Sequence, residues 1–242
     1  MDEHLFRRLI DEAATWPVSP RIAPFSVNER FADPRMAGLC LYVNERLPRA
    51  RLTFFTIGAL FTERRLETLR PVRGVESVFL SLHHSDPEEY RQETGLSFAA
   101  TIASIHRFLA FQSVYWPAAA VTLLRVQDGD AEKDCRFQDF CGREFPGVPT
   151  QLSYRYDWAG KIDSPWPYAD TLDIVCPRHS GMVILADGRV ALCCLDAEGS
   201  YALGDASRDS LLSIYNSPRA RSYRSRTKRE CGSPCSTCNM RA

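Results

Sequence analysis

The sequence has no apolar run that approaches the length of a membrane span, which needs about 20 residues. A secretory signal peptide is not recognisable either. The first residues, MDEHLFRRLIDEAATW, predict an amphipathic helix whose apolar face is formed by Leu5, Phe6, Leu9 and Ile10. We therefore expect a cytoplasmic protein that has no membrane partner.

A large net charge is also missing, because 30 basic and 30 acidic side chains cancel. No overall field then draws the protein to nucleic acid. The one basic stretch, RARSYRSRTKRE at 219–230, lacks the interleaved aromatic residues of a nucleic-acid site and predicts the solvated face of a helix. No glycine-rich phosphate loop or Ser-His-Asp order stands out, so the catalytic residues stay unknown.

Strand-like and helix-like segments alternate through the first part of the chain. Short runs rich in β-branched and aromatic residues lie at 21–27, 51–57, 75–82, 119–126 and 148–156, with amphipathic stretches between them. This alternation favours an α/β fold with a parallel sheet covered by helices. The pattern changes after Trp158, so we place a domain boundary near residue 165, between an α/β domain at 1–164 and a small cysteine-rich domain at 165–242.

The chain contains nine cysteines, an odd number without any sign of secretion, so a disulfide framework is not expected. Cys40 falls on an apolar helix face, where packing in the core explains it. Packing is also the preferred reading for Cys135 and Cys141. The other cysteines gather in the C-terminal domain, which favours a metal ion or an iron-sulfur cluster.

The stretch VILADGRVAL at 183–192 predicts two strands joined by an Asp-Gly turn, and this hairpin would bring Cys176 near Cys193. Cys193 and Cys194 would be consecutive on the second strand, so their side chains point to opposite faces and only one joins a site.

Near the C-terminus, Cys235 and Cys238 form a C-x2-C knuckle, whose short loop can present two thiolates to one metal centre. Together with Cys176 and one of the pair Cys193 and Cys194 they make a set of four thiolates. Such a set suits either tetrahedral zinc or a 4Fe-4S cluster.

These cysteines, Gly188 between the first two, and the stretch SIYNSPRARSYR resemble the SPASM domain, or its shorter twitch form, of radical SAM enzymes. The resemblance implies an auxiliary 4Fe-4S cluster held by Cys176, Cys193, Cys235 and Cys238. The brevity of the tail is typical of the twitch form, with one auxiliary cluster.

The upstream region resembles the partial (β/α) barrel of the same superfamily, without its first strand. SVNERFADPR, FTIGALFTERRLETL and VFLSLHHSDPEEYRQETG match the places of family motifs. By this resemblance S-adenosylmethionine (AdoMet) would meet four residues at the carboxyl ends of the strands: Glu29, Thr56, Ser81 and His83. Arg30 and Ile57 stand where the family has Pro and Asn.

The C-x3-C-x2-C motif of the radical-generating cluster does not occur before Glu29. Cys231, Cys235 and Cys238 have that spacing, but their place at the tail argues against the same role, and Cys231 is expected to be a spare or alternative ligand. We interpret the sequence as a truncated or degenerate relative, so its activity as an enzyme stays open.

Three functional hypotheses follow from this. The first is a radical SAM/SPASM-type protein related to enzymes that modify peptides or small metabolites, which would then be its substrates. The second is a non-catalytic substrate-recognition module that works with a partner radical SAM enzyme. The third is a binding domain in which the four cysteines hold zinc.

Overall fold

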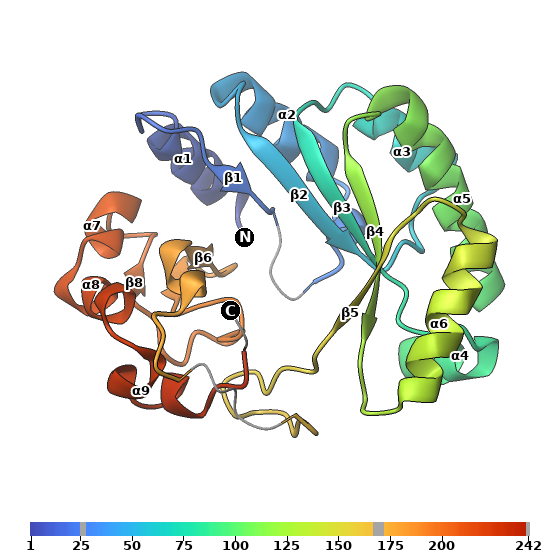
Figure 1. Ribbon diagram of the computed structural model, residues 1–242. Coiled ribbons are helices and arrows are strands. Elements are labelled where there is room, and N and C mark those ends of the chain that lie inside the picture. The colour runs from blue at the N-terminus through green and yellow to red at the C-terminus, as the bar shows by residue number, and fades with distance from the viewer. Residues whose placement is uncertain (25–27, 167–171, 241–242) are drawn as a thin grey trace. The chain divides into compact units, whose positions relative to one another are not determined.

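The computed structural model describes residues 1–24, 28–166 and 172–240. The chain forms two compact units. One comprises Trp16–Ser153, here called the sheet unit, and the other comprises Met1–Thr15 together with Tyr154–Ala242, here called the cysteine unit (Figure 1).

The sheet unit contains a five-stranded sheet in which each strand is parallel to its neighbour. In spatial and chain order the strands are β1 (Arg21–Ile22), β2 (Arg51–Thr56), β3 (Val75–Ser81), β4 (Ala120–Val126) and β5 (Thr150–Ser153). The predicted α/β class with a parallel sheet is therefore confirmed. Because the strands are parallel, β2 and β3 end at the same edge, where Thr56 is paired with Leu80 and Ser81 follows.

Helices connect these strands and cover one face of the sheet (Figure 1). They are the 3-10 turn η1 (Arg30–Ala32) and the α-helices α2 (Met36–Arg46), α3 (Glu63–Leu69), α4 (Pro87–Thr94), α5 (Phe98–Tyr115) and α6 (Ala131–Glu144). The Ser97 hydroxyl caps α5 by accepting a hydrogen bond from the Ala100 N–H. Aromatic side chains fill the space between helices and sheet, and the rings of Phe61 and Phe108 stack with centroids 4.4 Å apart.

The cysteine unit is built from short elements. Its sheet is antiparallel, in the order β6 (Val183–Ile184), β7 (Arg189–Ala191) and β8 (Gly204–Asp205). Its helices and turns are α1 (Glu3–Ala13), η2 (Pro177–Ser180), α7 (Leu211–Tyr215), α8 (Pro218–Ser225), α9 (Lys228–Cys231) and η3 (Cys235–Thr237). Asp187 and Gly188 form the turn between β6 and β7, as the sequence predicts, and Gly188 has a φ of 94° that favours glycine.

These compact units differ from the predicted domains 1–164 and 165–242 in two ways. The sheet unit ends at Ser153, and α1 groups with the cysteine unit. The side chain of Arg8 donates a hydrogen bond to the Ala206 carbonyl, and the Glu12 carboxylate accepts one from the Leu212 N–H at 3.2 Å. These contacts join residues far apart in the sequence, and amphipathic periodicity alone does not say which partner a helix has.

No helix in the described ranges is long and apolar enough to cross a membrane.

Candidate functional site

The four predicted ligands Cys176, Cys193, Cys235 and Cys238 line one pocket of the cysteine unit. They come from three separate segments. Cys176 caps η2, Cys193 follows β7, and Cys235 and Cys238 begin and follow η3. The hairpin and the knuckle therefore bring together thiols that are up to 62 positions apart in the numbering, from 176 to 238.

Only one of the two adjacent cysteines, Cys193 and Cys194, lines the pocket, as predicted. The predicted reason, that they point to opposite faces of a strand, is wrong. Strand β7 ends at Ala191, so Cys193 and Cys194 lie in the turn that follows and not on the strand. Cys193 is among the residues that line the pocket, and Cys194 is not. The turn is held by the Asp196 carboxylate, which accepts hydrogen bonds from the N–H groups of Leu192, Ser200 and Tyr201.

Cys235 is buried, and the other three cysteines of the pocket are half-buried. Burial raises the pKa of Cys193 and of Cys235 to about 12, and it also raises the pKa of Cys238. A metal centre needs thiolates, so its positive charge would have to displace these protons. Four cysteine sulfurs around one pocket are a donor set that fits an iron-sulfur cluster.

Among the other residues that line this pocket are two buried polar ones that the sequence did not indicate, His179 and Lys228. Both are buried, with exposed fractions of 6% and 2%. The only signal for His179 is its place one turn after Cys176, and Lys228 lies within a basic stretch that predicts a solvated face. The expectation of a fully solvated face is thus wrong at Lys228, because α9 turns this side chain into the pocket.

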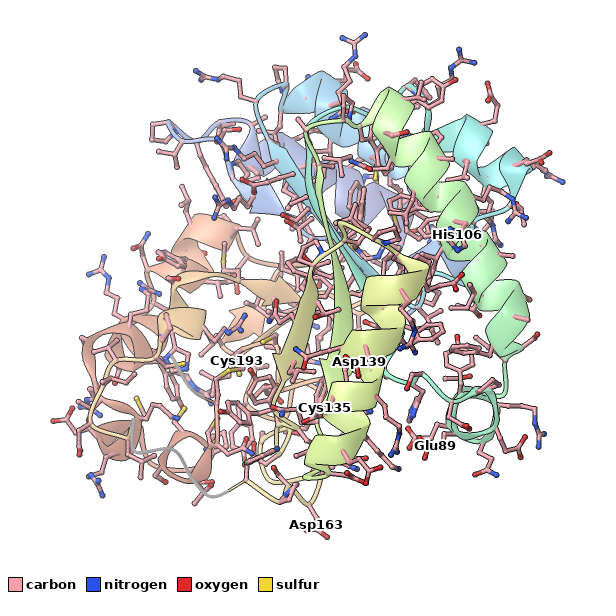
Figure 2. All side chains as sticks on the ribbon, turned by 45° about the vertical axis from the view of Figure 1, so that its right-hand side comes forward. Glu89, His106, Cys135, Asp139, Asp163 and Cys193 are labelled. Atoms are coloured by element: carbon pink, nitrogen blue, oxygen red, sulfur yellow. The ribbon has the colours of Figure 1, made fainter. Side chains whose placement is uncertain are left out.

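The remaining cysteines are not among the residues that line the pocket. Cys40 and Cys141 are buried in the sheet unit, as expected of packing residues, and burial raises the pKa of each to about 12. Cys135 is exposed on α6 beside Asp139 (Figure 2), so packing does not explain it. Cys231 is half-buried at the end of α9, and its pKa is raised by burial and by the nearby Glu230 and Cys176.

The sheet unit has a cleft of its own, with a volume of about 490 Å³. Three of the four predicted cofactor residues line it: Glu29, Thr56 and Ser81. The rest of the lining is mainly apolar, contributed by Asn28, Ala32, Phe55, Ile57, Ala59, Leu60 and Leu96. Thr56 and Ser81 are the last residues of β2 and β3, which places the cleft at the carboxyl edge of the sheet.

The Glu29 carboxylate is fixed by donors from two elements. It accepts hydrogen bonds from the Thr56 hydroxyl at 2.9 Å, from the Ile57 N–H at 2.8 Å and from the Phe31 N–H at 3.0 Å. The second of these bonds uses the main chain of Ile57, so it does not depend on the family's side chain at that position. Glu29 thus lies against the end of β2 with its position set before any ligand binds.

His83 does not line the cleft, although it lies next to the end of β3. Its own N–H donates to the Leu124 carbonyl at 3.0 Å, and its Nδ1 accepts from the Val126 N–H at 3.2 Å. Burial, followed by the charge of His84, lowers the pKa of His83 to about 4. These contacts join β3 to β4 and give His83 a structural role.

Comparisons with known proteins agree with both units. Residues 176–239 match the SPASM family, described as an iron-sulfur cluster-binding domain. No curated protein matches the sequence. The chain is similar to the structure of BtrN in complex with AdoMet and 2-DOIA, with a TM-score of 0.64 and 18% identity over 99% of this chain and 80% of that one.

It is also similar to anSMEcpe with bound AdoMet and the Cp18Cys peptide, with a TM-score of 0.70 and 13% identity over 93% of this chain and 75% of that one. At these identities the likeness shows the fold. The chain thus has the fold of these solved structures, and its residues 176–239 match the SPASM iron-sulfur cluster-binding domain.

Proposed function

We propose that the cysteine unit binds one 4Fe-4S cluster, as an auxiliary centre, through Cys176, Cys193, Cys235 and Cys238. The observation that carries the proposal is that these thiols, from three segments, line a single pocket. When bound, such a cluster accepts an electron or anchors a substrate. The protein supplies the four sulfur ligands and a pocket that limits access of water.

The main alternative is a single zinc ion on the same thiols. Zinc–sulfur bonds of about 2.3 Å would bring tetrahedral sulfurs to roughly 3.8 Å from one another. Within the described ranges, no three His, Cys, Asp or Glu side chains are arranged to hold a single metal ion. We favour the cluster, since residues 176–239 match an iron-sulfur cluster-binding family.

For the sheet unit we propose an AdoMet-binding cleft at Glu29, Thr56 and Ser81. A pre-positioned carboxylate suits the amino group of that molecule, because an ammonium donates to it with charge assistance. The structures of BtrN and anSMEcpe hold AdoMet, the first with 2-DOIA and the second, in one complex, with a peptide. These complexes support a small molecule or a peptide as the substrate class.

The cleft and the cysteine pocket do not make a complete radical-generating site. Reductive cleavage of AdoMet requires an iron that chelates it, and no cysteine precedes Cys40 in the sequence. Residues 1–242 therefore correspond to the auxiliary centre and the cleft without the thiolate triad. Acting with a partner radical SAM enzyme, as a substrate-recognition module, is the second candidate function, and the mostly apolar lining of the cleft is consistent with it.

The test is anaerobic reconstitution with iron and sulfide, followed by metal analysis. We expect about four irons per chain, from one cluster on four thiolates. Cys193→Ser should abolish iron binding, and Cys194→Ser should retain it, which gives a matched pair of adjacent residues. Bound zinc in anaerobically purified protein, with no uptake of iron, would favour the zinc alternative. Loss of iron only in Cys194→Ser would show that the ligand set is wrong.

A further inference from the structure

Lysine is rare in this protein, and one lysine lies in the cysteine pocket. The sequence contains only Lys133, Lys161 and Lys228. Lys228 is 2% exposed and begins α9, where the Thr227 hydroxyl caps the helix by accepting from the Glu230 N–H. Its side chain lines the pocket together with the four predicted ligands. The position is therefore fixed by the backbone of α9 and not by a flexible surface loop.

The charge of Lys228 lacks the usual compensation. Lys133 pairs with Glu89 at 3.1 Å, and Lys161 pairs with Glu198. The Nζ of Lys228 instead donates to two main-chain carbonyl oxygens, that of Cys238 at 2.9 Å and that of Met240 at 2.8 Å. Among the residues that the structure describes, no carboxylate forms an ion pair with this ammonium.

Burying an ammonium without an opposite charge is costly, because two neutral acceptors replace only part of its hydration. Lys228 acts to lower the pKa of Asp157, but burial is the larger influence and raises the pKa of that carboxyl group. Arg178 also lines the pocket, but it is exposed and its charge is screened by solvent. An anion inside the pocket would give this ammonium the opposite charge that the described residues do not supply.

A 4Fe-4S cluster on four thiolates is such an anion, since its net charge is negative and grows by one electron on reduction. We propose that Lys228 is the counter-charge of the cluster, and that it stabilises the bound cluster and raises its reduction potential. This inference rests on the proposed function, because it assumes a cluster on the four cysteines. Lys228 is then a positioning residue that also sets the potential through its charge.

The two hydrogen bonds explain how the charge is aimed. Nζ is bonded to the carbonyl of Cys238, a predicted ligand, and to that of Met240, two residues further on. The Met240 N–H in turn donates to the Cys238 sulfur at 3.4 Å. The ammonium, the N–H of Met240 and the sulfur of Cys238 therefore form one local network, and a cation held there acts on the sulfur at short range in a medium of low dielectric constant.

The experiment compares the reconstituted full-length protein with Lys228→Gln and Lys228→Arg, and uses Arg229→Gln as the control. Arg229 is the next residue, but it is exposed and pairs with Asp173, so its removal deletes the same charge outside the pocket. Iron content, the circular dichroism of the apo-protein and the reduction potential, from EPR-monitored titration, are measured for each. A wild type without iron would refute the proposed function before Lys228 is tested.

In loaded Lys228→Gln we expect the ratio of reduced to oxidised cluster at a fixed potential to fall about tenfold, a shift of about 59 mV to lower potential for one electron. Lys228→Arg should restore the potential, and Arg229→Gln should leave it unchanged. A Lys228→Gln protein that folds as apo-protein but loses iron, with iron restored in Lys228→Arg, also supports the proposal. The proposal would be overturned by an unchanged potential in loaded Lys228→Gln, by loss of iron that Lys228→Arg does not restore, or by an apo Lys228→Gln protein that is less folded than the apo wild type.

Discussion

The Nε2 atom of His179 lies 3.8 Å from the Sγ atom of Cys235. Its other ring nitrogen, Nδ1, lies 3.0 Å from the carbonyl oxygen of Tyr223. Since a carbonyl only accepts, Nδ1 carries the hydrogen of the neutral ring, and Nε2 is left to accept from the thiol. One buried imidazole thus connects α8 with the knuckle that holds two of the predicted ligands.

This relationship predicts a stability difference between two substitutions. His179→Ala leaves the Tyr223 carbonyl without its partner and should lower the free energy of unfolding of the cysteine unit by about 1–3 kcal/mol. His179→Asn can keep a donor near the position of Nδ1 and should lose less. Urea unfolding followed by circular dichroism measures both, and equal stability of His179→Ala and the wild type would contradict the assigned contact.

Gly188 gives a second prediction, because its φ of 94° strains any other residue. An added Cβ would also lie 3.1 Å from the Cβ of Ser207 and 3.2 Å from a carboxylate oxygen of Asp205. Gly188→Ala should therefore destabilise the hairpin by about 1–2 kcal/mol and speed the loss of iron to a chelator. Gly142→Ala is the control, since a Cβ there meets nothing within 4 Å and α6 should gain slightly. Equal stability and equal rates of iron loss in Gly188→Ala and Gly142→Ala would contradict the left-handed backbone at Gly188.

His83 predicts how the stability of the sheet unit depends on pH. Its pKa is lowered to about 4 in the folded state, against about 6.5 in an unfolded chain. The unfolded state therefore binds more protons between these values, so stability falls as the pH decreases from about 6.5 to 4. The pKa difference limits the loss of unfolding free energy to about 3 kcal/mol. Contact of the imidazole ring with solvent makes the actual loss smaller.

In His83→Asn this pH dependence should flatten, because asparagine tolerates the left-handed backbone at this position, where φ is 63°, and does not titrate. Hydrogen exchange of the Val126 amide, which donates to the His83 ring, reports on the sheet unit directly. Equal loss of protection at pH 4.5 in wild type and variant would show that another group is responsible.

Removal of the metal centre should affect the two compact units differently. A small metal domain takes much of its folding free energy from its ligand bonds, so an iron chelator should loosen the region around β6, β7 and α9. The amides of β2, β3 and β4, which belong to the other unit, should keep their protection. Hydrogen exchange before and after chelation measures this, and loss of protection in all five parallel strands would indicate that the units unfold together.

The last prediction concerns AdoMet. Residues 1–242, reconstituted and reduced, should release no 5′-deoxyadenosine above a control without protein, because no thiolate triad precedes Glu29. The competing hypothesis places an open cluster on Cys231, Cys235 and Cys238. Product that disappears in Cys231→Ala would establish that hypothesis and refute ours.

Much of the fold could be read from local sequence patterns. β-Branched and aromatic runs between amphipathic stretches predict the five parallel strands, and all five lie within their predicted ranges. The Asp-Gly turn and the C-x2-C knuckle likewise have local causes, which are a left-handed glycine and a short loop. Such features depend on residues close in sequence, so the sequence is sufficient to predict them.

The choice of Cys193 over Cys194 shows where local patterns are insufficient. An alternating strand would separate the two side chains, but β7 ends before both, and the turn around Asp196 decides which one lines the pocket. His83 shows the same limit. Its place next to a strand end was predictable, but its hydrogen bonds to β4 depend on a strand that lies about forty positions later in the chain.

By itself, the sequence determined the parallel α/β architecture, the hairpin and the knuckle, because period, turn chemistry and spacing are local properties. Only the tertiary structure decided that α1 joins the cysteine unit, that His83 lies outside the cleft, and that Lys228 lies in the cysteine pocket. The burial of a lysine within a basic stretch depends on the direction in which a short helix leaves its cap. That direction is set by packing between distant segments, such as the hydrogen bond from the Lys228 N–H to the Ile174 carbonyl, and not by neighbours in the sequence.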